Sequence, residues 1–192
     1  TPHFYLKNNL EYRMDFADRV QRYFFNDGLL TVGALTNRYR ILADLVEQSI
    51  YAETARWGDD NLNPPQDIDD WRRERDWILG QYLAQRNDVV LQQFRSSGLY
   101  PAIGAPFFSS YGGFVTPDAQ LTITQTNSAG IVYYTTDGSD PRRIGGDLAA
   151  NALLYTGPVP IGGNALVNAR VRLGTSWSAL VRANFTTSAY FK

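Results

Sequence analysis

Cysteine is absent from the 192 residues, and histidine occurs once, as His3. Without thiols the chain has no disulfide framework, no thiolate zinc site and no cysteine nucleophile. A single histidine at the start of the chain has no second member for a histidine metal cluster or a serine–histidine relay. These two absences exclude the commonest routes to metal binding and nucleophilic catalysis.

Long apolar runs and an excess of one charge are also missing. No run approaches the roughly 18 apolar residues of a membrane span, so we expect none. The net charge of -1 gives no electrostatic reason to expect nucleic acid as a partner. The sequence shows neither a glycine-rich phosphate loop nor a GxSxG elbow. It opens without methionine and without a signal-peptide pattern, which indicates a piece of a longer protein.

The chain changes character near residues 98–108. Helical spacing dominates before this point, and short β-rich runs separated by glycine follow it. The predicted fold class is therefore α+β multidomain: a three-helix subdomain over residues 1–100, then an all-β sandwich of immunoglobulin or fibronectin type over residues 101–192. The first part carries 12 Lys+Arg against 15 Asp+Glu and the second carries 6 against 4, which mildly favours their docking.

The spacing of apolar residues predicts three helices, over residues 8–26, over residues 36–57 and from Asp67 onward. A kink near residues 83–88 would interrupt the third helix. In the second helix the apolar stripe comprises Tyr39, Leu42, Val46 and Ile50. A glycine follows each predicted helix, and we expect a left-handed cap there; these glycines are Gly28, Gly58 and Gly98.

The second part contains β-rich runs at intervals of roughly 10 residues, which is typical of an antiparallel sandwich. They cover residues 112–116, 120–125, 130–136, 152–157, 166–174 and 178–185. Alternation is clearest in "VNARVRLG" at 167–174. It predicts that Val167, Ala169, Val171 and Leu173 face a core, while Asn168, Arg170 and Arg172 face water.

The end of the second predicted helix carries an acid, a base and an indole. Glu53 and Arg56 are one turn apart and can pair, and Trp57 offers an apolar face just before Gly58. This cluster either forms a small polar pocket or packs the helix end with Trp57 in the core.

Residues 133–143, "YYTTDGSDPRR", place two aspartates around a glycine. Asp137 can accept hydrogen bonds from backbone N–H groups of the turn, and Pro141 ends strand pairing. The turn needs no ligand, but Asp137 and Asp140 could also hold a cation. Calcium takes about six to eight oxygens, more than this segment supplies. Calcium is the one cofactor that the sequence leaves open.

Residues 104–186 resemble the chitobiase and β-hexosaminidase C-terminal type of β-sandwich module. The resemblance is carried by "GIVYYTTDGSDPR", "LYTGPV" and "VNARVRLGTSWSALVRANF". In that family the module is an accessory unit, presumed to be associated with carbohydrate, and catalysis occurs elsewhere in the chain. The resemblance implies a secreted bacterial protein, located outside the cell or on its surface.

The helical part is similar to the C-terminal end of the CotH-like family, the spore-coat-type kinases. "LEYRMDFADRVQRYFFNDGLLT", "AETARWGD", "WRRERDWI" and "RNDVVLQQFRSSGLYP" carry this similarity. In such kinases the nucleotide and metal ligands lie before these helices. The resemblance therefore implies a noncatalytic fragment of a kinase-like parent, and it transfers no catalytic residue to this chain.

Together these observations predict a structural or adhesive accessory fragment, which is not itself an enzyme. Its expected partners are upstream domains of the same polypeptide and a polysaccharide or surface protein. Tyr111, Tyr155 and Trp177 are the candidate contacts, although each ring also suits the core. Two alternatives remain open. Glu53, Arg56 and Trp57 could close the wall of an upstream kinase site, or the chain could self-assemble through sandwich edge strands into a surface or filament subunit.

Overall fold

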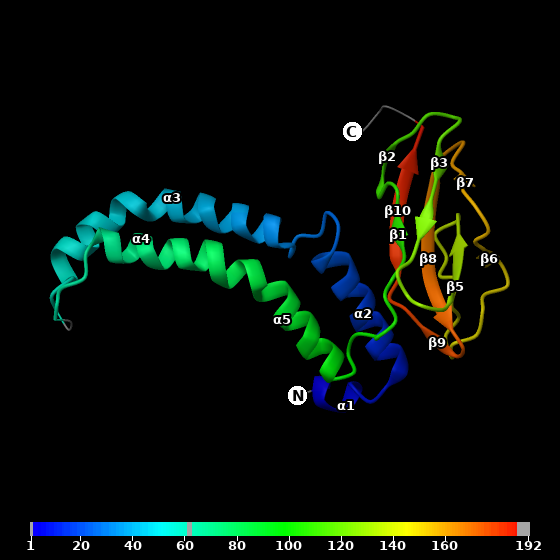
Figure 1. The fold of residues 1–192 in the computed structure, drawn as a ribbon, viewed down its shortest axis with the longest axis horizontal. Coiled ribbons are helices and arrows are strands. Elements are labelled where there is room, and N and C mark those ends of the chain that lie inside the picture. Colours follow the sequence, from blue (N-terminus) through cyan, green and yellow to red (C-terminus); the bar gives the residue numbers. More distant parts are fainter. Residues whose placement is uncertain (1, 61–62, 188–192) are drawn as a thin grey trace. The chain divides into compact units, whose positions relative to one another are not determined.

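The computed structural model describes residues 2–60 and 63–187. It has a helical N-terminal part followed by a β-sheet region, which confirms the predicted order of the two kinds of structure (Figure 1). The immunoglobulin or fibronectin type of the sandwich stays a prediction. Among the described residues, no helix is both long and apolar enough to cross a membrane.

The chain forms two compact units whose bounds differ from a simple cut at residue 100. One comprises Thr1–Arg22 together with Gln93–Lys192, and we call it the β unit. The other, Tyr23–Gln92, is the helical unit. The first helical segment of the chain thus belongs with the strands, although about seventy residues of other structure separate it from them in sequence.

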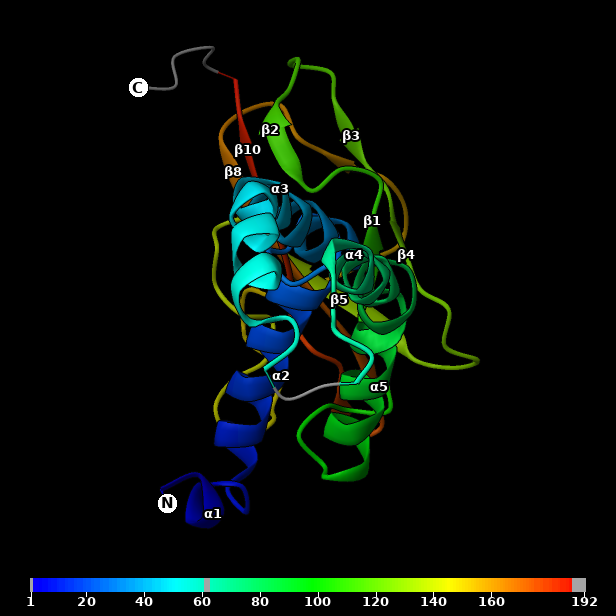
Figure 2. The ribbon, with the colours of Figure 1, turned by 90° about the vertical axis from the view of Figure 1, so that its left-hand side faces the viewer.

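The helical unit is a hairpin. Its long arm is α3 (Val32–Trp57), and its return arm is α4 (Ile68–Trp77), followed by the π-helical turn η1 (Ile78–Tyr82) and then α5 (Leu83–Ser96). Figures 1 and 2 show α3 and α4 side by side. The third predicted helix is therefore split, and the irregularity at η1 comes directly before the predicted kink.

Side chains at the helix starts explain where these helices begin. Thr31 caps α3 by accepting a hydrogen bond from the N–H of Ala34 at 3.3 Å, so the helix begins earlier than expected. Asp67, where the third helix was predicted to begin, caps α4 and forms a capping box with Asp70. Glu47 of α3 accepts from Arg72 of α4 at 2.6 Å and joins the two arms.

Two of the three predicted glycine caps are wrong. Gly98 has φ +72°, as expected, but Gly58 lies in the right-handed region at φ -62°. A Cβ on Gly58 would lie 2.3 Å from the carbonyl oxygen of Gln66, so close approach of the chain requires glycine there. After the first helix the left-handed residue is Asn26, at φ 58°, and not Gly28.

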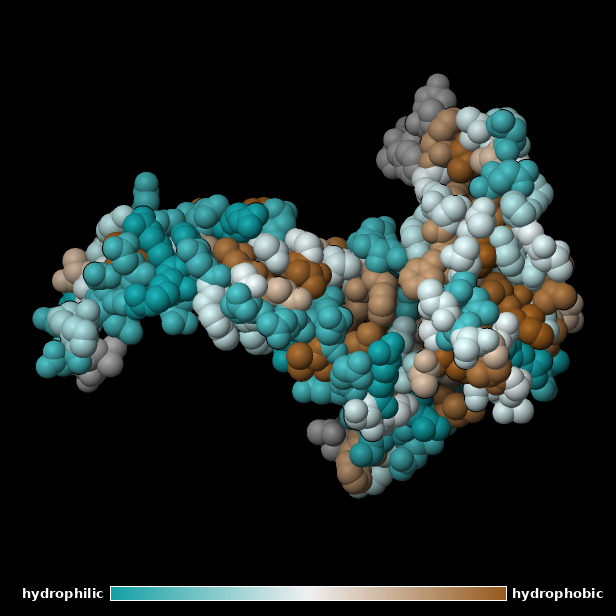
Figure 3. Space-filling view, in the orientation of Figure 1, coloured by the Kyte–Doolittle hydropathy of each residue, from teal (hydrophilic) through white to brown (hydrophobic). Residues whose placement is uncertain are grey.

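The apolar stripe predicted for α3 is also partly wrong. Leu42 is 55% exposed and Val46 is 42% exposed, and they lie with Ile41 and Leu45 on an outward face. Ala43 is buried on the opposite side. Because α3 carries apolar residues on both faces, periodicity alone could not choose between them. Figure 3 shows brown patches among the teal on the visible face of the helices.

The β unit contains α1 (Pro2–Leu6), most of α2 (Leu10–Phe24), the end of α5 and all the strands. The strands are β1 (Phe107–Phe108), β2 (Gly112–Phe114), β3 (Gln120–Leu121), β4 (Ile123–Thr124), β5 (Ile131–Thr135), β6 (Leu153–Leu154), β7 (Val159–Pro160), β8 (Ala165–Leu173), β9 (Ser176–Trp177) and β10 (Val181–Thr186). The main sheet has the order β2-β10-β8-β5-β6, with β9 beside β8. Two short pairs, β1-β4 and β3-β7, complete the β structure.

The core of the β unit lies on one face of the main sheet. Val167, Ala169 and Val171 of β8 are fully buried, and the β10 residues paired with this face are buried too. The short pairs bury Leu121 and Val159. Buried apolar residues on both sets of strands are consistent with a sandwich.

The other face of β8 corrects the predicted alternation. Asn168 and Arg170, which were expected to face water, are 0% and 2% exposed, whereas Leu173, expected in the core, is 45% exposed. Polar residues on this face can be buried because specific partners satisfy them. Those partners form the site described next.

Candidate functional site

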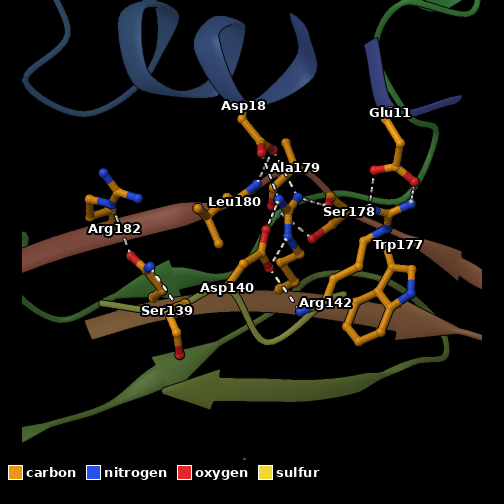
Figure 4. A network of polar contacts seen from close by, with 12 residues as sticks. Glu11, Asp18, Ser139, Asp140, Arg142, Trp177, Ser178, Ala179, Leu180 and Arg182 are labelled. Carbon is orange, nitrogen blue, oxygen red and sulfur yellow. Dashed lines mark hydrogen bonds and ion pairs between the residues drawn. The ribbon is translucent and has the colours of Figure 1, made fainter. Parts of the chain in front are cut away.

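Arg170, in the middle of β8, is the centre of a polar network (Figure 4). Its guanidinium donates to both carboxylate oxygens of Asp18 in α2, at 2.8 and 2.6 Å. It also donates to both oxygens of Asp140, at 2.8 and 2.6 Å, and to the carbonyl of Ser178 at 2.9 Å. Two carboxylates therefore flank one buried cation, each in bidentate geometry.

A second arginine–carboxylate pair lies near the start of α2. Arg142 donates through both terminal nitrogens to Glu11, at 2.7 Å each, and the N–H of Gly145 donates to the same carboxylate at 2.9 Å. Figure 4 shows Glu11 and Asp18 projecting from the helix toward the strands. Seven residues separate these two acids, close to two helical turns, so both project from the same side of α2.

Backbone contacts connect the two pairs. One oxygen of Asp140 accepts from the N–H of Arg142 at 2.8 Å, and one oxygen of Asp18 accepts from the N–H of Leu180 at 2.8 Å. Asn168 donates to the carbonyl groups of Gly138 and Ser139. The turn at 137–142, β8 and α2 are thus joined by hydrogen bonds from side chains to backbone as well as by ion pairs.

The charges of the network shift its acid–base behaviour. The hydrogen bond from Arg142, helped by the N–H of Gly145, lowers the pKa of Glu11 from 4.5 to about 2. For Arg170, burial opposes the charged form, but the hydrogen bonds to Asp140 and Asp18 outweigh it and raise the pKa above the usual value. Both shifts favour the charged forms of Glu11 and Arg170, which are the forms that make these ion pairs.

The hydrogen bonds of these carboxylates and guanidinium groups show what the network does. Every oxygen of Asp18 and Asp140 accepts a hydrogen bond from Arg170, and both terminal nitrogens of Arg142 are taken by Glu11. The network fastens α2 to the strands of the β unit and fixes the position of the 137–142 turn.

The two predicted cation ligands have separate roles. Asp137 accepts from the N–H and the hydroxyl of Ser139, at 3.0 and 2.6 Å, and from Asn151 at 2.8 Å. The hydroxyl and backbone hydrogen bonds from Ser139 lower the pKa of Asp137. Asp140 forms an ion pair with Arg170 at 2.6 Å. In the described part of the chain, no cluster of three or more acidic, histidine or cysteine residues could hold a metal ion.

The three aromatic candidates lie in different surroundings. Trp177 is only 4% exposed, and its indole N–H donates to the carbonyl of Gly146 at 2.7 Å. Tyr111 is half-buried and stacks on Phe108, with centroids 5.8 Å apart. Tyr155, also half-buried, accepts from the N–H of Ile123 at 3.0 Å. Each ring has a packing partner of its own, and they do not form one platform.

The helix-end cluster lies in the helical unit. The Arg56 guanidinium is 4.8 Å from the ring centroid of Trp57, which is 53% exposed. Among the described residues no ion pair links Glu53 to Arg56. Glu53 and Trp57 line a cavity of about 370 Å³, and the start of α4 supplies Asp67 and other lining residues. Arg56 is not among the lining residues of this cavity, so a polar pocket formed by all three side chains stays a prediction.

Sequence reasoning missed Arg170, Arg142, Asp18 and Glu11. Asp18 and Arg170 are 152 residues apart in sequence, and an alternating strand with arginine at polar positions ordinarily indicates a solvent-facing side. The only local signal was Asp140, whose turn position was recognised without its ion pair. Long-range charge pairing of this kind leaves no periodic trace in a single sequence.

Comparison with known proteins gives one match. The family model of the chitobiase/beta-hexosaminidase C-terminal domain matches residues 110–180, which covers β2 to β9 and includes Asp140, Arg142 and Arg170. Neither the curated proteins nor the solved structures gave a match to the chain. Residues 110–180 are therefore similar to the C-terminal domain of chitobiases and β-hexosaminidases, a noncatalytic accessory domain associated with carbohydrate.

Proposed function

We propose that this chain is a noncatalytic accessory part of a larger secreted or cell-surface bacterial protein, and that its β unit contacts carbohydrate. The observation that carries the proposal is the match of residues 110–180 to an accessory domain of glycosidases. The arginine network is compatible with it, because its ion pairs fasten α2 and the 137–142 turn to β8, which is a structural role. The proposed site of action is extracellular.

Polysaccharide binding tests this role. The purified chain is incubated with insoluble chitin, cellulose and bacterial cell-wall polysaccharide, and the bound fraction is measured after sedimentation, with serum albumin as the control protein. An accessory carbohydrate module is retained by at least one of them and hydrolyses none. Hydrolysis of any polymer, or retention no greater than that of albumin on all of them, would contradict the proposal.

A second candidate function concerns the helical unit. Its resemblance to the end of CotH-like kinases and the cavity beside Glu53 and Trp57 favour a role in completing an upstream kinase site. Arg56 over Trp57 would hold the indole at the cavity wall. Nucleotide binding by the isolated 192 residues, measured by calorimetry with ATP, would overturn the accessory role, whereas binding only when upstream residues are present supports a shared site.

Self-assembly is the third candidate. The strand β6 lies at the edge of the main sheet, and its two residues, Leu153 and Leu154, are 48% and 52% exposed. An exposed apolar edge can pair with another copy. Sedimentation at two protein concentrations tests this: a rise in mass supports assembly, and an unchanged monomer rules it out.

A further inference from the structure

A cavity of about 420 Å³ lies within the β unit, between the first half of α2 and the loops around β9. Its volume falls in the range of small-molecule sites, about 300–1,000 Å³. Its lining residues come from four segments that the sequence separates widely: Leu10, Arg13, Met14, Gly98, Leu99, Pro101, Arg142, Gly145, Gly146, Thr175, Ser176 and Trp177. All of them belong to the same compact unit.

Arg13 is the unusual member of this lining. Its Nε atom is buried and has no hydrogen-bond partner in the part of the chain that the structure describes. A Cβ built on Gly98 would lie 3.7 Å from its Nη1 atom, so the guanidinium lies against the chain at this glycine. A buried cationic donor without an acceptor is unfavourable, and native structures ordinarily supply one.

The neighbouring arginines have the carboxylate partners that Arg13 lacks among the described residues. Arg142, which lines the same cavity, is bound at both terminal nitrogens by Glu11, and Arg170 is bound by two carboxylates. No carboxylate of a described residue lies within ion-pair distance of Arg13. The cavity is therefore lined by a guanidinium that has no carboxylate partner among the described residues, and its planar fork matches an anionic group such as a carboxylate.

The other walls define the rest of the ligand. Leu99, Met14 and Trp177, all almost fully buried, form an apolar side. Exposed hydroxyl groups of Thr175 and Ser176 lie at the cavity as donors and acceptors. A ligand that fits has an apolar face, hydroxyl groups and one carboxylate. A pyranose ring that carries a carboxylate combines these features.

We infer that this cavity binds an acidic sugar, a hexuronate, with its carboxylate paired to Arg13 and its ring against Met14, Leu99 and Trp177. The inference deepens the proposed carbohydrate role and rests on it for the choice of a sugar. The requirement for an anionic group rests independently on Arg13, and a carboxylate is the anionic group of a hexuronate.

Titration of the intact chain with D-glucuronate, monitored by amide chemical shifts, tests the site. We expect saturable shifts at residues around the cavity and none with D-glucose, which has the same ring without the carboxylate. Arg13→Gln should weaken glucuronate binding about tenfold or more, since it removes charged hydrogen bonds. Arg13→Lys keeps the charge and should retain part of the affinity.

The matched control is Arg19→Gln on the same helix, because Arg19 is solvent-exposed and lies 3.9 Å from Asp15. It should leave binding unchanged. Unaltered urea midpoints of all three variants show that each is folded. Equal binding of glucose, or equal loss in the control variant, would overturn the role of Arg13. Equal binding of hexanoate would overturn the sugar, and absence of glucuronate binding would overturn the site.

These outcomes are distinct from failure of the broader proposal. If polysaccharide is retained and glucuronate does not bind, the cavity assignment is wrong while the accessory role stands. If glucuronate binds through Arg13 but no polysaccharide is retained, the site is real and the polysaccharide role is wrong.

Discussion

Replacing Asp18 by alanine removes three hydrogen bonds that fasten α2 to the strands. Two come from the guanidinium of Arg170 and one from the N–H of Leu180. A hydrogen bond to a charged group contributes about 1.5–3 kcal/mol, and a buried N–H left without an acceptor costs about 1–3 kcal/mol. Arg170 keeps Asp140, and relief of the repulsion between the two carboxylates offsets part of the loss. We therefore expect the free energy of unfolding to fall by about 2–4 kcal/mol.

The chain offers a matched control on the same helix. Asp15 is 76% exposed, and its ion pair with Arg19 is long, at 3.9 Å. Asp15→Ala should therefore change the free energy of unfolding by about 0.5 kcal/mol or less. Both substitutions alter the charge and the helix propensity of α2 equally. Their difference therefore isolates the buried network.

Urea denaturation provides the measurement, and the two units require a local reporter. In a background with Trp57, Trp71 and Trp77 changed to phenylalanine, Trp177 alone reports the β unit. Its fluorescence gives the midpoint and the free energy of unfolding. A loss below about 1 kcal/mol for Asp18→Ala, or one equal to that of Asp15→Ala, would refute the anchoring role of the network.

Three further predictions concern the same unit. The pKa of Glu11 is lowered from 4.5 to about 2, so the stabilisation that Glu11 provides is complete above pH 4.5 and is lost as the pH falls through about 2. The difference in urea midpoint between wild type and Glu11→Gln should therefore be constant above about pH 5.5 and vanish near about pH 1.5. A difference that grows on acidification would contradict this. Changing Asp137 and Asp140 together to asparagine should lower the melting temperature equally with and without calcium, because Asp137 is bound by Ser139 and Asp140 by Arg170. Calcium-dependent melting of the wild type alone would show a cation site. Gly138→Ala should destabilise the unit by about 1–3 kcal/mol, since glycine there has φ +83° and an added Cβ would lie 2.6 Å from a side-chain carbon of β8, whereas Gly157→Ala, with nothing within 4 Å, should be near neutral in thermal melting.

Two features that depend on interactions between near neighbours in the sequence were predicted correctly. The cap at Asp67 and the turn at Asp137 both appear as expected, because each depends on a side chain bonding backbone N–H groups two or three residues away. The β-rich runs were predicted from the alternation of apolar and polar residues and from the glycines between the runs. Five of the six runs contain a strand that pairs in the main sheet, and the run at 120–125 supplies β3 and β4 of the short pairs.

The arginine network could not be predicted, for a physical reason. Arg170 alternates with Val171 and Ala169 as a solvent-facing residue would, and its burial is favourable because Asp140 of the turn and Asp18 of a distant helix both pair with it. Residues 1–22 likewise belong to the β unit through contacts with parts of the chain that are distant in sequence. In α3, apolar residues on both faces left Leu42 and Val46 undecided until the packing was known.

The central structural claim is that the first part of α2 folds with the strands and not with the helical hairpin. Native-state hydrogen exchange at increasing urea tests it most directly. We predict that amides of residues 10–22 exchange in the same cooperative step as those of 165–173, and that Asp18→Ala lowers the free energy of that step while leaving 32–57 unchanged. Exchange of residues 10–22 together with 32–57, independent of β8, would contradict the account.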